Sequence, residues 1–301
     1  MREILLRFRP VIGRAFLILF VCFFCTFIDA AEAGSCSSEE RLYLVFETVE
    51  GNISIELLSQ AAPKAVATLV RLVEGPIFDP ELTGNELRTK AAGYYDGLEF
   101  DRASSGSFLT TSVRYPVDAI VIESEISADA LGLSERVIKD FPEAMEVWQR
   151  EILPYQRGIR REEDLHPLLA EWLKQWAETH QPDFLIGVSQ ESINEALGYH
   201  YQEGLPSQPV VRGAVTLEVL TPRWSSPRMT INFRNRPDHD GRRMVVGRVV
   251  SGLDLAEQLA TRKLTPTKMA RKRPLVPVRI NKALLECRNP GDLKQEQIGG
   301  E

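Results

Sequence analysis

The chain is organised around residues 93–111, which read GYYDGLEFDRASSGSFLTT. Asp96-Gly97 can take the positive φ angles of a tight turn. Alternation along a strand places Phe100 and Arg102 on the same face. Phe108-Leu109 follow after a bend rich in Ser and Gly. Two interpretations stay open from these residues alone: a half-buried strand whose arginine reaches solvent, or a functional arginine beside apolar groups.

The composition is that of an ordinary globular protein, with 301 residues, 44% hydrophobic and 26% charged. The length allows one large domain or two small ones. The net charge is −6, from 36 Lys+Arg and 42 Asp+Glu. This balance gives no support to a nucleic-acid partner, because such binding depends on phosphate neutralisation.

The first 33 residues have the pattern of a secretory signal peptide. Arg2, Arg7, Arg9 and Arg14 precede an apolar run, and Ala31-Glu32-Ala33 provides small residues for cleavage after Ala33. We therefore expect export to the periplasm or another extracytoplasmic compartment. Two alternatives remain: an uncleaved membrane anchor, and lipidation of Cys36, since Ala33-Gly34-Ser35-Cys36 partly resembles a lipoprotein box.

Strand and helix patterns follow the leader. Residues 42–48 and the alternating 52–57 predict a hairpin turning at Glu50-Gly51, and Pro63 opens a predicted helix that Gly75 ends. Residues 76–92 are expected to be an irregular connection.

The middle of the chain is helical and charged. Residues 142–153 and 162–180 have helical periodicity, and Glu162, Glu163 and Asp164 suit the N-terminus of the second helix. An aromatic and leucine stripe follows one face of that helix. The stripe favours core packing, with a partner-binding groove as the alternative; its residues are Leu165, Leu168, Leu169, Trp172, Leu173 and Trp176.

Strand patterns return at residues 210–218, 228–233, 243–250 and 278–287, with a short helix at 254–259. The basic stretch 262–273 is interpreted as a solvated loop. Strands in hairpins with a helix near each end of the set indicate an antiparallel, barrel-like β fold with helices.

Several separated segments together resemble the cyclophilin-type peptidyl-prolyl isomerases. They are FETVEGNISIEL (46–57), APKAV (62–66), YDGLEFDR (95–102), RGAVTL (212–217) and DGRRMVVGRVVSG (240–252). The order and spacing agree over about 42–110 and 205–287. The resemblance implies a mainly β fold with α: an eight-stranded antiparallel barrel capped by helices, plus a helical insertion.

The expected organisation is a leader (1–33), a first barrel part (40–124), the insertion (125–195), a second barrel part (196–288) and a tail (289–301). The first and last barrel strands would be antiparallel neighbours. The resemblance therefore implies a disulfide between Cys36 and Cys287, the two cysteines that remain after the leader; from the residues alone, two unrelated thiols are the alternative.

The resemblance also implies the activity: isomerisation of X-Pro bonds in exported polypeptides, without a covalent intermediate, metal or cofactor. Arg102 would be the catalytic arginine that stabilises the twisted amide. The residues expected to bind the substrate are Phe100, Phe108, Leu109, Thr111, Arg228, Met229, Thr230, His239 and Arg243.

Departures from the family pattern concentrate at this site. Asp101 stands where His is usual, Thr111 and Arg228 where Gln is usual, Thr230 where a second pocket Phe is usual, and Arg243 at the pocket His. The usual Trp is missing from 238–241. Arg228 and Arg243 are either surface charges or part of a pocket that favours acidic peptides. A peptide-binding module or chaperone without turnover is thus the alternative to an enzyme.

Other chemistries lack support. The four histidines (His166, His180, His200 and His239) are scattered, and no Cys-x-x-Cys occurs. No Gly-rich phosphate loop and no Gly-x-Ser-x-Gly elbow are present. The expected partners are proline-containing polypeptides, with a further partner surface possible on the insertion and membrane contact only through an uncleaved leader or lipidated Cys36.

Overall fold

Alternating apolar residues form nine strands in the computed structural model, which describes residues 36–75, 93–114, 120–158, 165–263 and 274–289. The leader, the connection 76–92, the acidic residues 162–164, most of the basic stretch and residues 290–301 of the tail lie outside this part. The strands are β1 Arg41–Thr48, β2 Gly51–Leu57, β3 Glu99–Ser104, β4 Phe108–Thr111, β5 Ile122–Glu123, β6 Ala214–Thr221, β7 Trp224–Asn232, β8 Val245–Ser251 and β9 Val278–Arg288.

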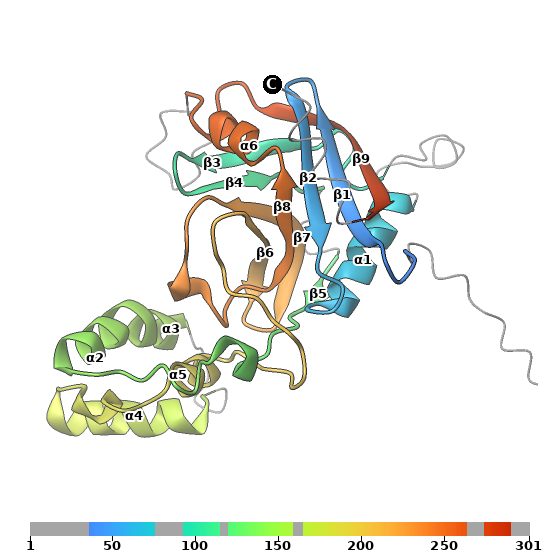
Figure 1. The fold of residues 1–301 in the computed structure, drawn as a ribbon. Coiled ribbons are helices and arrows are strands. Elements are labelled where there is room, and N and C mark those ends of the chain that lie inside the picture. Colours follow the sequence, from blue (N-terminus) through green and yellow to red (C-terminus); the bar gives the residue numbers. More distant parts are fainter. Residues whose placement is uncertain (1–35, 76–92, 115–119, 159–164, 264–273, 290–301) are drawn as a thin grey trace, which may run out of the picture. The chain divides into compact units, whose positions relative to one another are not determined.

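Eight of these strands close into an antiparallel barrel (Figure 1). Their order is β4-β3-β9-β1-β2-β8-β6-β7, and β4 pairs again with β7 to complete the ring. The short β5 pairs with β7 through Ile122 and Ser225, on the same edge of β7 as β4, since β6 occupies the opposite edge. The expected eight-stranded antiparallel barrel is confirmed.

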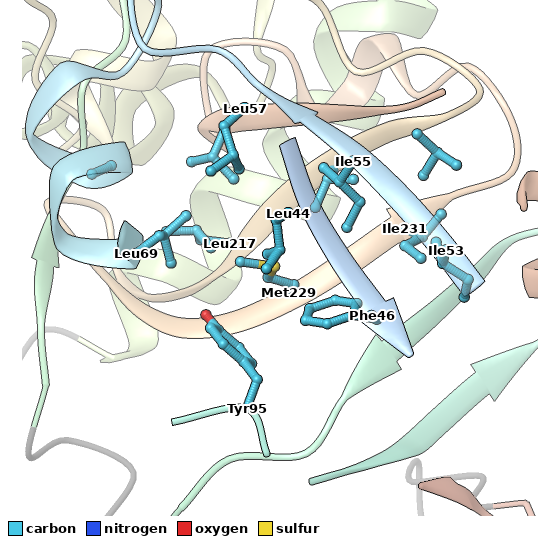
Figure 2. Close-up of a cluster of buried hydrophobic side chains, with 14 of the residues drawn as sticks. Leu44, Phe46, Ile53, Ile55, Leu57, Leu69, Tyr95, Leu217, Met229 and Ile231 are labelled. Carbon is cyan, nitrogen blue, oxygen red and sulfur yellow. The ribbon is translucent and has the colours of Figure 1, made fainter. Parts of the chain in front are cut away.

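The interior of the barrel is filled by the side chains that point inward at every second position of the strands. Leu44 and Phe46 of β1 face Ile53 and Ile55 of β2, and all four side chains are fully buried (Figure 2). Burying one such side chain contributes about 1.5–3 kcal/mol. The other labelled members of this cluster are Leu57, Leu69, Tyr95, Leu217, Met229 and Ile231.

Two helices cover the barrel. Helix α1 (Pro63–Glu74) follows β2 and ends at Gly75, as predicted, and it packs against β9 and β5. Helix α6 (Leu253–Ala260) lies by the β1–β2 turn, where Leu255 approaches Gly51, whose φ is 132°. The α1 N-terminus has no side-chain cap of its own. Instead the buried Glu125 carboxylate accepts the Lys64 and Ala65 N–H groups at 3.1 and 2.8 Å.

The segment between β5 and β6 is built from helices. They are α2 (Phe141–Val147), a π-helical turn η3 (Trp148–Ile152), α3 (Leu153–Gly158), α4 (Pro167–Thr179) and α5 (Gln190–Ala196), with 3₁₀ turns η2 (Asp129–Leu131) and η5 (Asp183–Leu185). A 3₁₀ turn η6 (Pro237–His239) lies between β7 and β8.

These helices have a hydrophobic core separate from that of the barrel. Trp148 is fully buried and stacks on Trp176, with ring centroids 4.6 Å apart. Leu169 and Trp172 of the predicted stripe are buried in it. Leu168 is 38% exposed, however, because it lies beside the buried row of α4. The stripe is thus core except at Leu168.

The strand predictions needed correction at three starts. β7 begins at Trp224 instead of residue 228, and β8 begins at Val245 instead of residue 243. Residues 210–213 were expected to begin a strand, but β6 begins only at Ala214. Gly213 has a φ of 86°, which interrupts the extended conformation. The predicted strands 42–48 and 52–57 and the helix opened by Pro63 are confirmed.

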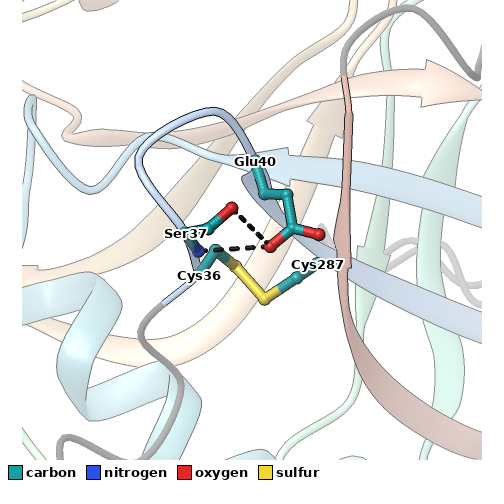
Figure 3. The surroundings of a disulfide bond; sticks show 4 residues. All are labelled: Cys36, Ser37, Glu40 and Cys287. Carbon is teal, nitrogen blue, oxygen red and sulfur yellow. Dashed lines mark hydrogen bonds between the residues drawn. A yellow bond between two sulfur atoms is a disulfide. The ribbon is translucent and has the colours of Figure 1, made fainter.

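A disulfide joins Cys36 to Cys287, the two cysteines that were expected to pair (Figure 3). Antiparallel β1 and β9 bring the cysteines together, since Leu42 pairs with Cys287. A sulfur bonded to Cys287 cannot carry a lipid, so the lipidated form of Cys36 is excluded where this disulfide exists. No helix in the described ranges is long and apolar enough to cross a membrane.

The disulfide closes a loop of 251 residues, and its removal should destabilise the fold. The chain-entropy model and measured losses of native disulfides predict a cost of roughly 2–5 kcal/mol in the double variant Cys36→Ala, Cys287→Ala. Urea unfolding of wild type with and without dithiothreitol measures this cost. The double variant is the control, because dithiothreitol should not change its midpoint; equal midpoints for oxidised wild type and the variant would contradict the prediction.

Candidate functional site

Arg102 lies on the outer face of the barrel, opposite to the face predicted by simple alternation with Phe100. A register shift between Phe100 and Arg102 in the β3–β4 pairing makes Asp101 a bulge residue. Phe100 therefore points into the core, where it is 1% exposed, and Arg102 points outward from a position paired with Thr110. The prediction that both side chains share a face was wrong for this reason.

The neighbours of Arg102 come from the strands that close the barrel. Thr110 of β4 pairs with Thr230 of β7, and Thr230 pairs in turn with Thr216 of β6. Directly paired residues project to the same face. This surface is called the Arg102 face below, and its side chains are Arg102, Phe108, Thr110, Glu218, Arg228 and Thr230.

A carboxylate holds the Arg102 guanidinium. Glu218 of β6 accepts a hydrogen bond from Arg102 Nη1 at 2.6 Å, and both side chains are about one-quarter exposed (26% and 24%). The other oxygen of Glu218 lies 3.6 Å from Arg228 Nε. Glu218 was not predicted as a site residue, although its alternation with the core residue Leu217 places it on the outer face.

Two of the departures from the family pattern form a buried ion pair. Arg228 Nη2 donates to Asp101 Oδ2 at 2.9 Å, and the side chains are 5% and 10% exposed. A charge at this depth is stable only when it is paired. Asp101 and Arg228 thus neutralise each other's charge. Together with Glu218 and Arg102 they form a charge network of four residues.

Hydroxyl groups occupy the centre of the face. The Thr110 and Thr230 Oγ1 atoms are 3.0 Å apart, and both side chains are buried. Thr111 Oγ1 accepts the Met229 backbone N–H at 3.1 Å. Thr111 therefore braces β7 rather than facing outward. Phe108, paired with Asn232, is the half-buried aromatic of the face.

Three residues expected to bind substrate lie inside the barrel instead. Phe100, Leu109 and Met229 belong to the buried core, with exposures of 1%, 0% and 1%. The strand pleat and the Asp101 bulge turn these side chains inward. They support the face from below and cannot touch a peptide on it.

His239 and Arg243 lie at the loop that precedes β8. Arg236 Nη2 lies 2.6 Å from His239 Nε2 and also donates to Asp238 Oδ2 at 2.7 Å. Since an arginine only donates, His239 Nε2 accepts and the imidazole is neutral. Burial lowers the pKa of His239 to about 4, and Arg243 and Arg236 act in the same direction.

The helical segment anchors this loop. Arg242 donates to Asn194 Oδ1 at 2.7 Å and forms an ion pair with Glu151. Arg136 pairs with the buried Asp240 at 2.9 Å. The residues before Arg243 are therefore fixed by side chains from α5, from the π-helical turn and from the segment before α2.

The arrangement does not form a metal centre. Within the described ranges, no group of three or more His, Cys, Asp or Glu side chains is placed to hold a metal ion. What it offers is a fixed guanidinium, an aromatic ring and hydroxyl groups on the outside of a closed barrel.

The fold is an eight-stranded closed antiparallel barrel. Helix α1 follows its first hairpin, helix α6 lies beside the turn of that hairpin, and Arg102 lies on the outer face. Residues 43–125 match the family described as cyclophilin type peptidyl-prolyl cis-trans isomerase/CLD. The chain is thus similar to this cyclophilin-type family over residues 43–125, a part that holds most of β1, all of β2 to β5, and Arg102. No curated protein matches it in sequence.

Solved structures of cyclophilins are similar to the chain at low identity. A cyclophilin type peptidyl-prolyl cis-trans isomerase of Cryptosporidium parvum is 12% identical, with 83% of this chain and 99% of that chain covered and a TM-score of 0.41. A structure of the same protein in the presence of the dipeptide Ala-Pro covers 81% and 98%, with 12% identity and a TM-score of 0.40. A cyclophilin of Hirschia baltica is 16% identical, covering 85% and 84%, with a TM-score of 0.36.

The Asp101–Arg228 pair should show strong energetic coupling. Asp101→Asn or Arg228→Gln alone breaks the 2.9 Å ion pair and leaves the other charge buried, which should destabilise the fold by about 3–5 kcal/mol. The loss of unfolding free energy in the double variant should be smaller than the sum of the two single losses by roughly 1–3 kcal/mol. Urea unfolding of the four proteins at pH 7 measures the cycle, and additive losses would show that the pair is not coupled.

His239 should make stability depend on pH in a defined window. Its lowered pKa means that the unfolded chain takes up a proton before the folded chain does, so stability falls as the pH drops from about 6.5 towards about 4. The full effect is roughly 3 kcal/mol at most. His239→Gln should remove this part of the pH dependence of the unfolding free energy.

Asp238 provides an internal comparison for that measurement. Its pKa is lowered to about 2 by the hydrogen bond from Arg236, so its contribution is lost only as the pH falls from about 4 towards 2. Urea midpoints of wild type and His239→Gln between pH 7 and 4.5 therefore isolate the histidine. Parallel pH curves for the two proteins would contradict the prediction.

Proposed function

We propose that the protein is a peptidyl-prolyl cis-trans isomerase acting on X-Pro bonds of polypeptides, with Arg102 as the catalytic residue. The observation that carries this proposal is the placement of the Arg102 guanidinium: it is on the outer face of a cyclophilin-type barrel, partly exposed and held in position by Glu218. Phe108 lies on the same face, as the first residue of β4 directly after the turn at 105–107 of the β3–β4 hairpin.

The reaction requires little more than a well-placed donor. Amide resonance sets a barrier of about 18–20 kcal/mol to rotation of the peptide bond. In the twisted state the lone pair of the prolyl nitrogen has left resonance and can accept a hydrogen bond. A guanidinium that donates to this nitrogen binds the twisted state better than the planar one, which lowers the barrier.

Glu218 orients Arg102 without using up its donors. A guanidinium has five N–H groups, and Glu218 is its one hydrogen-bond partner among the residues that the structure describes. The remaining N–H groups are available to a substrate. An ion pair that fixes the donor before substrate arrives reduces the reorganisation needed at the transition state.

The hydroxyl pair of Thr110 and Thr230 should lower the affinity of the face for a proline ring. Thr110 and Thr230 present polar groups to each other at the centre of the face, 3.0 Å apart. Replacing an aromatic floor by threonine removes roughly 1–3 kcal/mol of apolar contact. Substrates are therefore held mainly by Phe108 and by polar contacts, which favours weak binding and a narrow choice of peptides.

The same observations favour a second function, a peptide-binding module without turnover. Glu218 neutralises part of the charge of Arg102, and the polar centre lowers affinity for proline. In that case peptides bind to the Arg102 face, but the rate of isomerisation stays at its uncatalysed value of one event in tens to hundreds of seconds.

Export of the protein is part of the proposal. The leader pattern of residues 1–33 supports it. So does the Cys36–Cys287 disulfide, because such bonds persist in oxidising compartments. The substrates would then be other exported polypeptides.

Arg102→Ala should abolish most of the activity. Loss of a preorganised donor costs about 10²–10³ in rate, and Arg102→Lys should recover little because a lysine lacks the rigid fork. A protease-coupled assay on residues 34–301 with an Ala-Pro peptide gives the rates. Arg248→Ala is the matched control, since Arg248 is an exposed barrel arginine that also forms an ion pair with a glutamate, the buried Glu56, at 2.8 Å.

Two results would reject the enzyme. In one, wild type is no faster than the uncatalysed reaction; in the other, Arg102→Ala is as fast as wild type. Peptide-induced chemical-shift changes in the first case would support the binding module instead.

A further inference from the structure

Arg243 extends the Arg102 face on the far side of Glu218. The β6–β8 pairing joins Thr216 to Val245, and Leu217 N–H donates to Met244 O at 3.4 Å. Leu217 and Met244 both point into the core. The next residues along the two segments, Glu218 and Arg243, therefore lie next to each other on the outside.

The guanidinium of Arg243 is half-buried and lacks a direct partner. Among the described residues it forms neither a hydrogen bond nor an ion pair. Burial lowers its pKa, and the neighbouring Arg236 acts in the same direction, while Glu218 and Asp238 act against them. The charge is therefore partly removed from water in a region that already holds other cations.

Each neighbouring cation has a carboxylate of its own. Arg102 pairs with Glu218, Arg228 with Asp101, Arg236 with Asp238 and Arg242 with Glu151. His239 is neutral and adds no charge. Among the described residues of this region, Arg243 is thus a cation without a carboxylate partner, although the whole chain has a net charge of −6.

A peptide carboxylate is the group that this arrangement fits. A guanidinium binds a carboxylate through two parallel hydrogen bonds, and partial burial makes that contact stronger than in water. Arg102 and Arg243 flank the same Glu218. An extended peptide advances about 3.3 Å per residue, so a side chain one or two residues from the proline at Arg102 comes within reach of Arg243.

We infer that Arg243 is a specificity residue that binds an acidic side chain near the proline, so that the preferred substrates are prolyl peptides with Asp or Glu at one of the two preceding positions. This inference rests on the proposed function, because it assumes that the proline is bound at Arg102.

Matched peptides test the inference. Four peptides carry Glu or Gln either immediately before the proline or one position earlier, and exchange NMR gives the isomerisation rate of each with the protein. Wild type should have a kcat/KM roughly tenfold higher for Glu than for Gln at one of these positions, as expected for one charge-assisted contact. Arg243→Gln should bring this ratio close to one.

Arg234→Gln is the control variant. Arg234 is exposed, lies between β7 and η6, and its replacement changes the net charge by the same amount. If the preference came from the general charge of the protein, both variants would lose it equally. The inference requires the Arg234 variant to keep the wild-type ratio.

The result also separates this inference from the proposed function. If wild type isomerises all four peptides at similar rates, the enzyme stands and the acidic preference is refuted. If no peptide is isomerised above background, the enzyme is refuted, and chemical-shift titrations with the same peptides decide about Arg243. Equal Kd values for Glu and Gln peptides, or a preference that survives Arg243→Gln, would overturn the inference.

Discussion

The pairing of β4 with β7 is the constraint on which the site depends. β4 is only four residues long, yet it joins β3 on one side and β7 on the other and so closes the ring. Without this pairing, Arg102 on β3 and Glu218 on β6 would belong to opposite edges of an open sheet. Closure brings them within 2.6 Å, so the barrel itself creates the contact that orients the arginine.

At the site, positively charged side chains are paired with negatively charged ones. Asp101 and Arg228 both depart from the family pattern, and each would be costly alone at its depth, but together they form one buried pair. Glu218 does the same for Arg102 at the surface. The Arg102 face therefore carries a network of paired charges that fixes the positions of its side chains. Such a network holds its members rigidly and leaves less apolar surface exposed than aromatic side chains would.

The sequence predicted the regular parts of the fold better than the site. Alternation located the β1–β2 hairpin, and the ordered motifs indicated the barrel and Arg102. The bulge at Asp101 could not be read from the pattern, and it decided that Phe100 points inward and Arg102 outward. Glu218 was missed because its role depends on the register between distant strands. The capping of α1 by Glu125, some 60 residues away, is non-local for the same reason.

The helical segment connects to the site through the loop before β8. Arg242 reaches Asn194 and Glu151, and the backbone N–H of Arg243 donates to His239 O at 3.0 Å. Asp240, bound to Arg136, also accepts the Val210 N–H at 2.8 Å and so fixes the same loop to the chain before β6. The position of Arg243 beside Glu218 therefore depends on residues outside the barrel. The helical segment, which has its own hydrophobic core, thus holds the loop that carries Arg243 in place beside the barrel strands that carry Arg102 and Glu218.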